Sequence, residues 1–221
     1  MLNVKTARSK LLHMYKDEDF VIDRTGQKTV ELIGESILVD EDYIIRPTND
    51  EYFERELAWY KSQSRKVDDM PGPIPKIWQD ISSNNGGYIN SNYGWCIWSH
   101  ANGNQYQHTL NELRSNPDSR RAIMLYNRPS MHTDYNADGM NDFICTLASH
   151  FFIRDGKLVM HVTMRSCDLV FGAGNDWPWF RYVQKLLSED LGVPVGDFIF
   201  TAGSAHVYER HFKFLEAWLN D

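Results

Sequence analysis

A cysteine, a serine and an arginine have the types and spacing that could support covalent chemistry in this sequence. Cys145 opens one apolar run, and Arg165 and Ser166 lie near the end of the next. A guanidinium close to a thiol lowers the pKa of that thiol and favours the thiolate, which is the nucleophilic form. Cys145 is therefore a candidate nucleophile. The alternative is that a single cysteine in so apolar a run is a buried small hydrophobic residue.

Two strands joined by a tight turn must bring these groups together. Asp155-Gly156 separates two runs of β-branched and apolar residues, and this pair suits the positive φ angles of a two-residue hairpin turn. A ladder that extends from this turn places Cys145 opposite Ser166. Strict alternation would point Arg165 to the other face, so we expect a bulge or break in the second strand near this residue.

A carboxyl group on an apolar helical stripe is the second chemical feature. Asn49 or Asp50 can cap a helix that runs to about Ser64, and Glu56 falls on its apolar face. Burial raises the pKa of a carboxyl group toward the range that is useful for proton transfer. The alternative is that Glu56 lies at the edge of the stripe, reaches water and has no catalytic role.

Length and composition favour one large domain, residues 1–221, in a reducing compartment. The chain has 221 residues, is 42% hydrophobic, and contains no low-complexity tract or Pro/Gly-rich linker that would divide it. The net charge of −7 argues against a broad nucleic-acid-binding surface. The three cysteines fit neither a disulfide framework nor a zinc site, so no metal is expected. No apolar run approaches the ~20 residues that span a bilayer, and no signal peptide is evident, so we expect a cytoplasmic protein.

Hydrophobic spacing and capping residues predict further elements along the chain. They are helices within 1–18, over 105–114, over 179–187 with an end at Gly192, and over 212–218, and strands over 29–33, 122–126 and 198–200.

An ordered set of motifs resembles the thymidylate synthases and, within them, the bacteriophage deoxycytidylate 5-hydroxymethylases. The set covers about residues 20–215 and is far more specific than any single motif. Its members are Asp23-Arg24-Thr25-Gly26, Glu56-Leu57-Ala58-Trp59, Asn92-Tyr93-Gly94, Asn116-Pro117-Asp118-Ser119-Arg120-Arg121, Cys145, Arg165-Ser166-Cys167-Asp168, Gly172 to Asp176, and His206-Val207-Tyr208.

The resemblance implies an α+β fold with a large mixed β-sheet flanked by helices, and a homodimer in which the sheets of two subunits pack together. It also implies roles for individual residues. Cys145 would be the nucleophile and Glu56 the general acid/base that organises water. The substrate phosphate would be bound by Arg24, Arg165 and Ser166, together with Arg120 and Arg121 reaching across the dimer interface from the other subunit. The sugar hydroxyl would be held by His206 and Tyr208, and Tyr93 would lie near the reacting centre. The folate-binding set would be Asp168 at the pterin, Trp78 against the ring, Arg46 at the glutamate tail, and Gly172.

The aspartate at position 176 indicates which pyrimidine base the substrate carries. The thymidylate synthases that this chain resembles carry Asn at the matching position. The Asn amide can both accept from uracil N3–H and donate to its O4. An ionised Asp only accepts, which suits the 4-amino group of cytosine and its protonated N3. Asp176 before Trp177-Pro178 would also make a good helix N-cap, and both roles are compatible.

The resemblance therefore implies hydroxymethylation of dCMP with 5,10-methylenetetrahydrofolate in the cytoplasm, the host's if the chain is phage-encoded. The alternatives are thymidylate-synthase-type methylation, hydroxymethylation of dUMP or CMP, and a non-catalytic role within a nucleotide-synthesis complex. Thr146 and His150 stand where typical synthases have His and Gln. The sequence also lacks the C-terminal tail that closes over folate in those synthases, which leaves closure over folate an open question.

Overall fold

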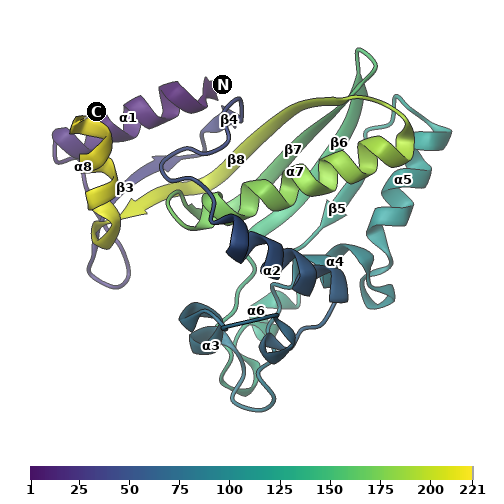
Figure 1. Ribbon diagram of the computed structural model, residues 1–221, viewed down its shortest axis with the longest axis horizontal. Coiled ribbons are helices and arrows are strands. Elements are labelled where there is room, and N and C mark those ends of the chain that lie inside the picture. The colour runs from purple at the N-terminus through teal and green to yellow at the C-terminus, as the bar shows by residue number, and fades with distance from the viewer. Residues whose placement is uncertain (221) are drawn as a thin grey trace. The chain divides into compact units, whose positions relative to one another are not determined.

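The computed structural model describes residues 1–220, which divide into two compact units. The first unit consists of residues 1–49 together with the chain from Arg154 onward, and the second unit spans residues 50–153 (Figure 1). A single catalytic domain over residues 1–221 stays a prediction. No helix within residues 1–220 has the length and apolar character needed to cross a membrane.

The first unit contains a mixed sheet built around one long strand. Its elements are β1 (Leu2–Asn3), α1 (Val4–Lys16), β2 (Val21–Ile22), β3 (Lys28–Ile33), β4 (Ser36–Leu38), β7 (Lys157–Asp168), α7 (Gly172–Leu191), β8 (Val195–Tyr208), the 3-10 turn η4 (Glu209–His211) and α8 (Phe212–Asn220). Strand β8 pairs antiparallel with β3 and β4 and parallel with β7, while β1 pairs parallel with β4 and β2 antiparallel with β3. The predicted mixed sheet flanked by helices is confirmed.

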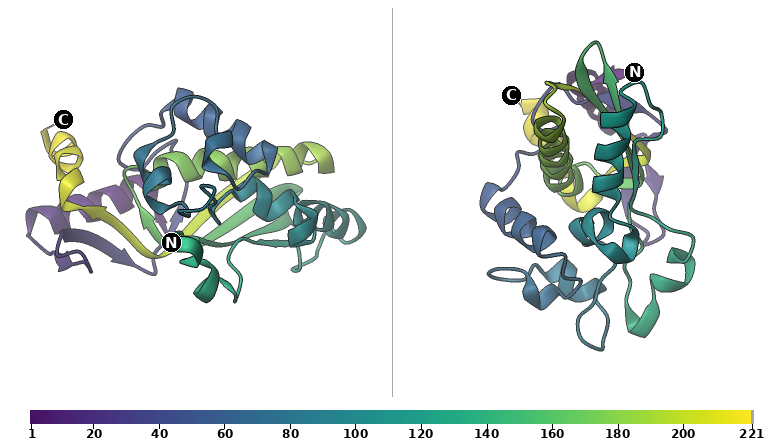
Figure 2. Two further views of the ribbon diagram at one scale, coloured as in Figure 1. Left: turned by 90° about the horizontal axis from the view of Figure 1, so that it is seen from below. Right: turned by 90° about the vertical axis from the view of Figure 1, so that its right-hand side faces the viewer.

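Helix α7 covers one face of β7 and β8 (Figure 1). Its apolar stripe includes Trp177 and Phe180, whose rings lie 5.7 Å from Phe200 and 6.3 Å from Phe198. Burying an aromatic side chain of this size contributes roughly 2–3 kcal/mol. Alternate residues of the two strands point away from this core and remain partly exposed: Val159, His161, Thr163, Ile199 and Thr201. Figure 2 shows the same helix and strands from two further directions.

Helix α7 begins earlier than the sequence predicted, and its start corrects one expectation. The N-cap predicted for Asp176 is wrong, because the helix starts at Gly172 and contains Pro178 in its interior. Proline has no N–H to donate, which leaves the carbonyl four residues back, that of Gly174, without its helical partner. The Thr48 hydroxyl donates to this carbonyl at 2.7 Å. A side chain outside the helix therefore replaces the bond that Pro178 removes.

The second unit is mainly helical. Its elements are α2 (Asp50–Ser62), η1 (Val67–Asp69), α3 (Lys76–Ile81), α4 (Tyr93–Trp98), η2 (His100–Asn102), α5 (Gln105–Ser115), β5 (Ile123–Leu125), α6 (Met131–Asp134), η3 (Ala137–Gly139) and β6 (Thr146–Arg154). Helices α2 and α4 approach so closely at Gly94 that an added Cβ would lie 1.8 Å from the carbonyl oxygen of Tyr60. Only glycine permits this approach. Strands β5 and β6 pair antiparallel, with Ile123 opposite His150.

The predicted turn is confirmed, but the predicted irregularity lies elsewhere. Asp155 and Gly156, which connect β6 and β7, have φ angles of 49° and 72°. The pairing of β7 with β8 shifts register between Leu158 and Met160 and then runs unbroken to Asp168. The break expected near Arg165 is thus absent from this pairing, and Arg165 and Ser166 alternate in direction as residues of a regular strand do.

Candidate active site

Glu56 is the centre of a hydrogen-bonded group in the second unit. Helix α2 carries it on its buried face, where Glu56 is only 4% exposed. The Tyr52 hydroxyl, one turn earlier on α2, donates to Oε1 of Glu56 at 2.6 Å, and the indole Nε1 of Trp78 donates to the Tyr52 oxygen at 2.9 Å. Burial raises the pKa of Glu56 to about 7, although hydrogen bonds from Tyr52, Tyr60 and Trp78 act in the opposite direction. The predicted burial and pKa shift are confirmed.

An aromatic series links the neighbourhood of Glu56 to the residue beside Cys145. Tyr60 stacks on Tyr93, with ring centroids 5.5 Å apart, because Gly94 allows α4 to lie against α2. The Thr146 hydroxyl donates to the Tyr93 hydroxyl at 2.8 Å. Cys145 is half-buried, and its thiol lies 3.9 Å from the carbonyl oxygen of Phe143. Packing and hydrogen bonds within the second unit therefore connect Glu56 through Tyr60 and Tyr93 to Thr146, the residue that follows Cys145.

Arg120 and Arg121, two adjacent arginines of the second unit, are exposed. Arg121 forms an ion pair with Glu112 at 3.0 Å, and Ser119 donates to the same carboxylate. Nε2 of His150 lies 2.9 Å from the backbone oxygen of Arg120. A carbonyl oxygen only accepts, so Nε2 must carry the proton. His150 thus holds the backbone at Arg120, in the segment that carries Arg120 and Arg121 and leads into β5.

Gly172 lies beside two acidic side chains of the first unit. A Cβ added at Gly172 would lie 3.5 Å from Cβ of Asp168 and 3.8 Å from Oδ2 of Asp176. Asp168 accepts a hydrogen bond from the backbone of Val170 at 2.9 Å, and its Oδ2 lies 3.4 Å from Nδ1 of His211. Asp168 and Asp176 therefore both lie beside Gly172.

His206 presents a buried nitrogen suited to a hydroxyl group. Strand β8 places it beside Tyr208, with ring centroids 4.5 Å apart, and its Nδ1 lies 3.1 Å from the Ser204 hydroxyl, which also bonds Glu31. His206 is 5% exposed, and burial lowers its pKa, so the neutral ring is favoured. Among the described residues its Nε2 has no hydrogen-bond partner. A buried polar atom of this kind is costly unless a ligand satisfies it.

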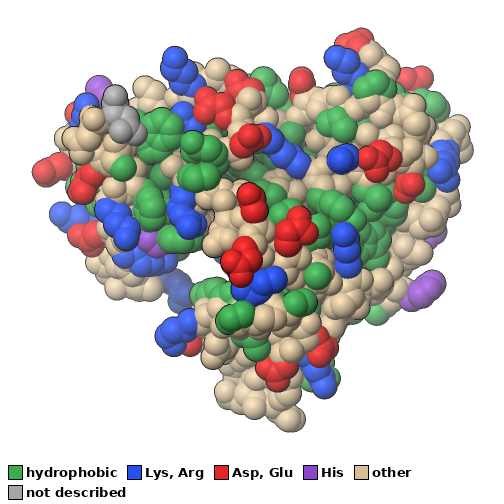
Figure 3. Space-filling model, in the orientation of Figure 1, with side chains coloured by type: hydrophobic (Ala, Val, Ile, Leu, Met, Phe, Trp, Pro, Cys, Tyr) green, Lys and Arg blue, Asp and Glu red, His purple; other side chains and the backbone are tan. Residues whose placement is uncertain are grey.

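Basic side chains gather at one end of the first unit, over α8 and the β2–β3 connection (Figure 3). Arg24 lies on that connection, in a turn closed by the Asp23 carboxylate, which accepts from the backbone of Thr25 and Gln27 at 2.7 and 3.0 Å. The guanidinium of Arg46 lies over the rings of Phe171 and Phe214, at 4.7 and 6.0 Å from their centroids. Such arginines suit phosphate and carboxylate ligands.

The sequence prediction missed two residues that contact the candidate site. Tyr52 precedes Glu56 by four residues, and this helical spacing could have identified it as a partner. His211 faces Asp168, but nothing in its sequence spacing indicated so.

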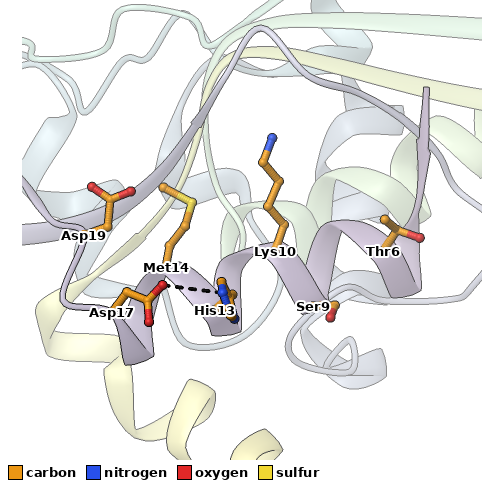
Figure 4. A pocket seen from close by; sticks show the side chains of 7 residues that line it. All are labelled: Thr6, Ser9, Lys10, His13, Met14, Asp17 and Asp19. Carbon is orange, nitrogen blue, oxygen red and sulfur yellow. Dashed lines mark ion pairs between the residues drawn. The ribbon is translucent and has the colours of Figure 1, made fainter.

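A hollow of about 530 Å³ lies along α1 (Figure 4). Its lining side chains are Thr6, Ser9, Lys10, His13, Met14, Asp17 and Asp19. His13 and Asp17 lie 3.5 Å apart, and both are largely exposed, so their attraction is weak. The hollow contains none of the candidate site residues. Within residues 1–220, no group of His, Cys, Asp and Glu side chains is arranged to hold a metal ion.

Comparison with known proteins identifies relatives over almost the whole chain. The family model described as thymidylate synthase matches residues 10–221. The deoxycytidylate 5-hydroxymethyltransferases of Enterobacteria phages T2 and T4 are each 50% identical, over 99% and 98% of this chain and 92% and 91% of their own length. A thymidylate synthase of Corynebacterium aurimucosum is 28% identical, over 86% of this chain and 73% of its own.

The fold agrees with a solved structure. Thermostable thymidylate synthase A from Bacillus subtilis superimposes with a TM-score of 0.72, covering 99% of this chain and 84% of that chain at 22% identity. The expected fold is confirmed.

Proposed function

Because the chain belongs to the thymidylate synthase family, we propose that it is a deoxycytidylate 5-hydroxymethyltransferase. It would convert dCMP, 5,10-methylenetetrahydrofolate and water into 5-hydroxymethyl-dCMP and tetrahydrofolate. The observation that carries this proposal is the 50% identity, over 98–99% of the chain, to the phage enzymes of that name. Identity to the Corynebacterium thymidylate synthase is only 28%.

Asp176 supplies the chemical reason for choosing cytosine. Its carboxylate accepts from the 4-amino group of the base and from protonated N3, whereas uracil would present O4, a second acceptor. Two acceptors placed together leave both unsatisfied, and such a mismatch rejects a substrate strongly. The buried Nε2 of His206, with Tyr208, suits the sugar hydroxyl. Arg24, Arg165 and Ser166 would bind the phosphate.

The residues predicted at the folate fit its chemistry. Trp78 offers an aromatic face whose indole N–H is already held by Tyr52. Asp168 offers a carboxylate to the pterin, and Arg46 offers a guanidinium to the glutamate tail, while Gly172 keeps the corner beside Asp168 open. Bound there, 5,10-methylenetetrahydrofolate would supply the one-carbon unit.

Covalent catalysis would begin at Cys145. Its sulfur bonds to C6 of the base, and the electron pair of the C5–C6 double bond makes C5 a carbon nucleophile. C5 bonds to the one-carbon unit and loses its proton, and departure of tetrahydrofolate leaves an exocyclic methylene. Water held by Glu56 adds to that carbon, and the electron pair returned to the ring expels the Cys145 thiolate. The half-neutralised Glu56 carboxyl suits proton exchange with water near neutral pH.

The enzyme would act as a homodimer in the cytoplasm, the host's if the chain is phage-encoded. The homodimer is supported by the partly exposed residues on the face of β7 and β8 that points away from α7, which a second copy could cover. Arg120 and Arg121 are exposed, as side chains that reach a partner's phosphate must be. Arg121 would exchange its ion pair with Glu112 for that phosphate.

The test is the nucleotide product, identified by mass spectrometry after incubation with methylenetetrahydrofolate and dCMP, CMP or dUMP in turn. We expect 5-hydroxymethyl-dCMP from dCMP and far slower reaction of the other two. Methylated dUMP, with dCMP untouched, would overturn the proposal in favour of thymidylate synthesis.

A further inference from the structure

His206 has two polar neighbours on the mixed sheet of the first unit. In the antiparallel pairing of β3 with β8, His206 lies opposite Glu31, and Ser204 is two residues earlier on β8. Residues that lie opposite each other, and residues two apart on one strand, share a face of the sheet. The Ser204 hydroxyl therefore reaches both neighbours: it donates to Oε1 of Glu31 and lies 3.1 Å from Nδ1 of His206.

The direction of these hydrogen bonds assigns the proton of the His206 ring. A carboxylate only accepts, so the single proton of the Ser204 hydroxyl points at Glu31. The Ser204 oxygen can then only accept from Nδ1 of His206. The backbone carbonyl of Ser204 also accepts from this ring, and Nε2 has no hydrogen-bond partner among the described residues, so this bond too comes from Nδ1. Both acceptors of Ser204 therefore require the proton on Nδ1.

Nε2 of His206 is consequently a buried acceptor. A neutral imidazole has one N–H, and the hydrogen bond made by one ring nitrogen decides which nitrogen carries the proton. Only the imidazolium form would place a second proton on Nε2. Burial, with a smaller effect of Arg210, lowers the pKa of His206 against the opposing charges of Asp168 and Glu31, so the neutral ring is favoured.

On the basis of the function proposed above, we propose that Ser204 is a positioning residue that holds His206 in the Nδ1–H tautomer, so that Nε2 accepts a hydrogen bond from the 3′-hydroxyl of the nucleotide. This is the one free hydroxyl on the sugar of dCMP. Glu31 contributes by keeping the Ser204 hydroxyl an acceptor toward His206. A nucleotide with a hydrogen or fluorine atom in place of the 3′-hydroxyl leaves the buried Nε2 unpaired and is rejected.

The first test is the tautomer itself, measured on the ligand-free protein with histidine labelled with the heavy nitrogen isotope. Protonated and unprotonated ring nitrogens resonate in separate ranges of the nitrogen NMR spectrum. We expect Nδ1 of His206 in the protonated range and Nε2 in the unprotonated range, with the two signals assigned by their loss in His206→Gln. The reverse pattern would overturn the proposal. No substrate or turnover is needed, so this result does not depend on the proposed function.

The second test compares equilibrium binding of dCMP and of its 2′,3′-dideoxy analogue, which lacks the hydroxyl. Ser204→Ala removes one of the two acceptors that hold Nδ1, so the ring is less firmly oriented. The Kd for dCMP should rise about fivefold, as the loss of one neutral hydrogen bond implies, while the Kd for the dideoxy analogue should change less than about twofold. Equal weakening of both ligands would indicate a general structural effect and overturn the positioning role.

Ser204→Thr is the conservative variant. It keeps the hydroxyl, and a β-branched residue suits a strand, so the Kd for dCMP should stay within about twofold of the wild-type value. A loss as large as that of Ser204→Ala would show that the hydroxyl is not the group responsible. Should Ser204→Ala fail to fold, the tautomer of the wild-type protein still decides the proposal.

Ser36→Ala is the matched control. The Ser36 hydroxyl also bonds a residue of β8, Thr201, at 2.8 Å, but this residue is five positions before His206. Both Kd values should remain at the wild-type level, and a selective loss of dCMP binding equal to that of Ser204→Ala would contradict the proposal. If the wild type binds dCMP but makes no 5-hydroxymethyl-dCMP, the proposed function fails, while the two Kd values still decide the role of Ser204.

Discussion

At the scale of single residues, the burial of Glu56 opposes stability. Its pKa is raised from 4.5 to about 7 in the folded protein, chiefly by burial. A group whose folded pKa is raised favours the folded state below its unfolded pKa, and this contribution is lost as pH rises through the folded pKa. The wild-type protein should therefore lose stability between about pH 4.5 and pH 8 through this one group.

Glu56→Gln should remove that loss. A shift of about 2.5 units is equivalent to about 3 kcal/mol, and the variant's free energy of unfolding should rise by this amount relative to wild type between pH 4.5 and pH 8. Urea denaturation of both proteins at the two pH values measures this change in the difference between their free energies of unfolding. Glu54→Gln, an exposed change on the same helix, should show no such trend. A pH-independent difference for Glu56→Gln would show that Glu56 ionises in the folded protein as it does in water.

Asp176 should determine which base reacts. Asp176→Asn supplies an amide that can donate to O4 and accept from N3–H, so the ratio of kcat/KM for dUMP over dCMP should rise by about a hundredfold or more, as the loss of two mismatched hydrogen bonds implies. Competition between the two nucleotides measures this ratio directly. An unchanged ratio would remove the hydrogen-bond explanation of specificity, whatever the absolute rates.

The residue types of the site were predictable, but several of their partners were not. Helical spacing and apolar neighbours were enough to predict a buried Glu56, and the structure confirms the burial. The Tyr52 hydroxyl accepts a hydrogen bond from Trp78, which is 26 positions away in the sequence. His211 meets Asp168 only because η4 follows β8, and no local pattern encodes that contact.

At the scale of elements, α7 depends on a contact made from outside the helix. Local rules place an N-cap at Asp176 because Pro178 favours a first helical turn, yet the N-cap is Phe171, five residues earlier in the chain. The extension is possible because the Thr48 hydroxyl satisfies the Gly174 carbonyl. The two early glycines of this helix and its proline hide the true start from sequence reasoning.

Thr48→Val should lower the free energy of unfolding by removing this hydrogen bond to α7. The change keeps the side-chain shape and leaves the Gly174 carbonyl without its donor, which should lower the free energy of unfolding by about 1–3 kcal/mol. Pro178→Ala restores a backbone N–H for the same carbonyl, so Thr48→Val should cost much less in that background. Denaturant unfolding of the four proteins gives the coupling.

Thr133→Val is the control for this cycle. Its hydroxyl donates to the Ser130 carbonyl at 2.9 Å at an exposed site, where water can replace it. It should change stability by less than about 0.5 kcal/mol. Equal costs of Thr48→Val with and without Pro178 would mean that the threonine stabilises the protein by some other contact.

Strand lengths were less predictable than helices. Alternation and β-branched residues indicated only a short strand near Phe198–Phe200, whereas β8 extends to Tyr208. Gly203 interrupts the apolar pattern, but an added Cβ there would lie 2.7 Å from the carbonyl oxygen of Arg165. The glycine marks close contact between strands, which a single sequence does not distinguish from a turn.

At the scale of the whole molecule, the fold and the relatives agree on the family, and the activity is decided by chemistry at one carbon. A methyl-forming enzyme and a hydroxymethyl-forming enzyme share the addition of the thiol and the one-carbon transfer. They differ in whether hydride or water reaches the exocyclic methylene. Glu56, held by Tyr52, is the group that would bring water to it.

The most direct measurement is the product formed from dCMP and methylenetetrahydrofolate in water enriched in the heavy oxygen isotope. Mass spectrometry should find 5-hydroxymethyl-dCMP with the heavy oxygen in its hydroxymethyl group, because in the proposed mechanism that oxygen comes from water held by Glu56. Recovery of unchanged dCMP, or of a 5-methyl product without the label, would contradict the proposed function.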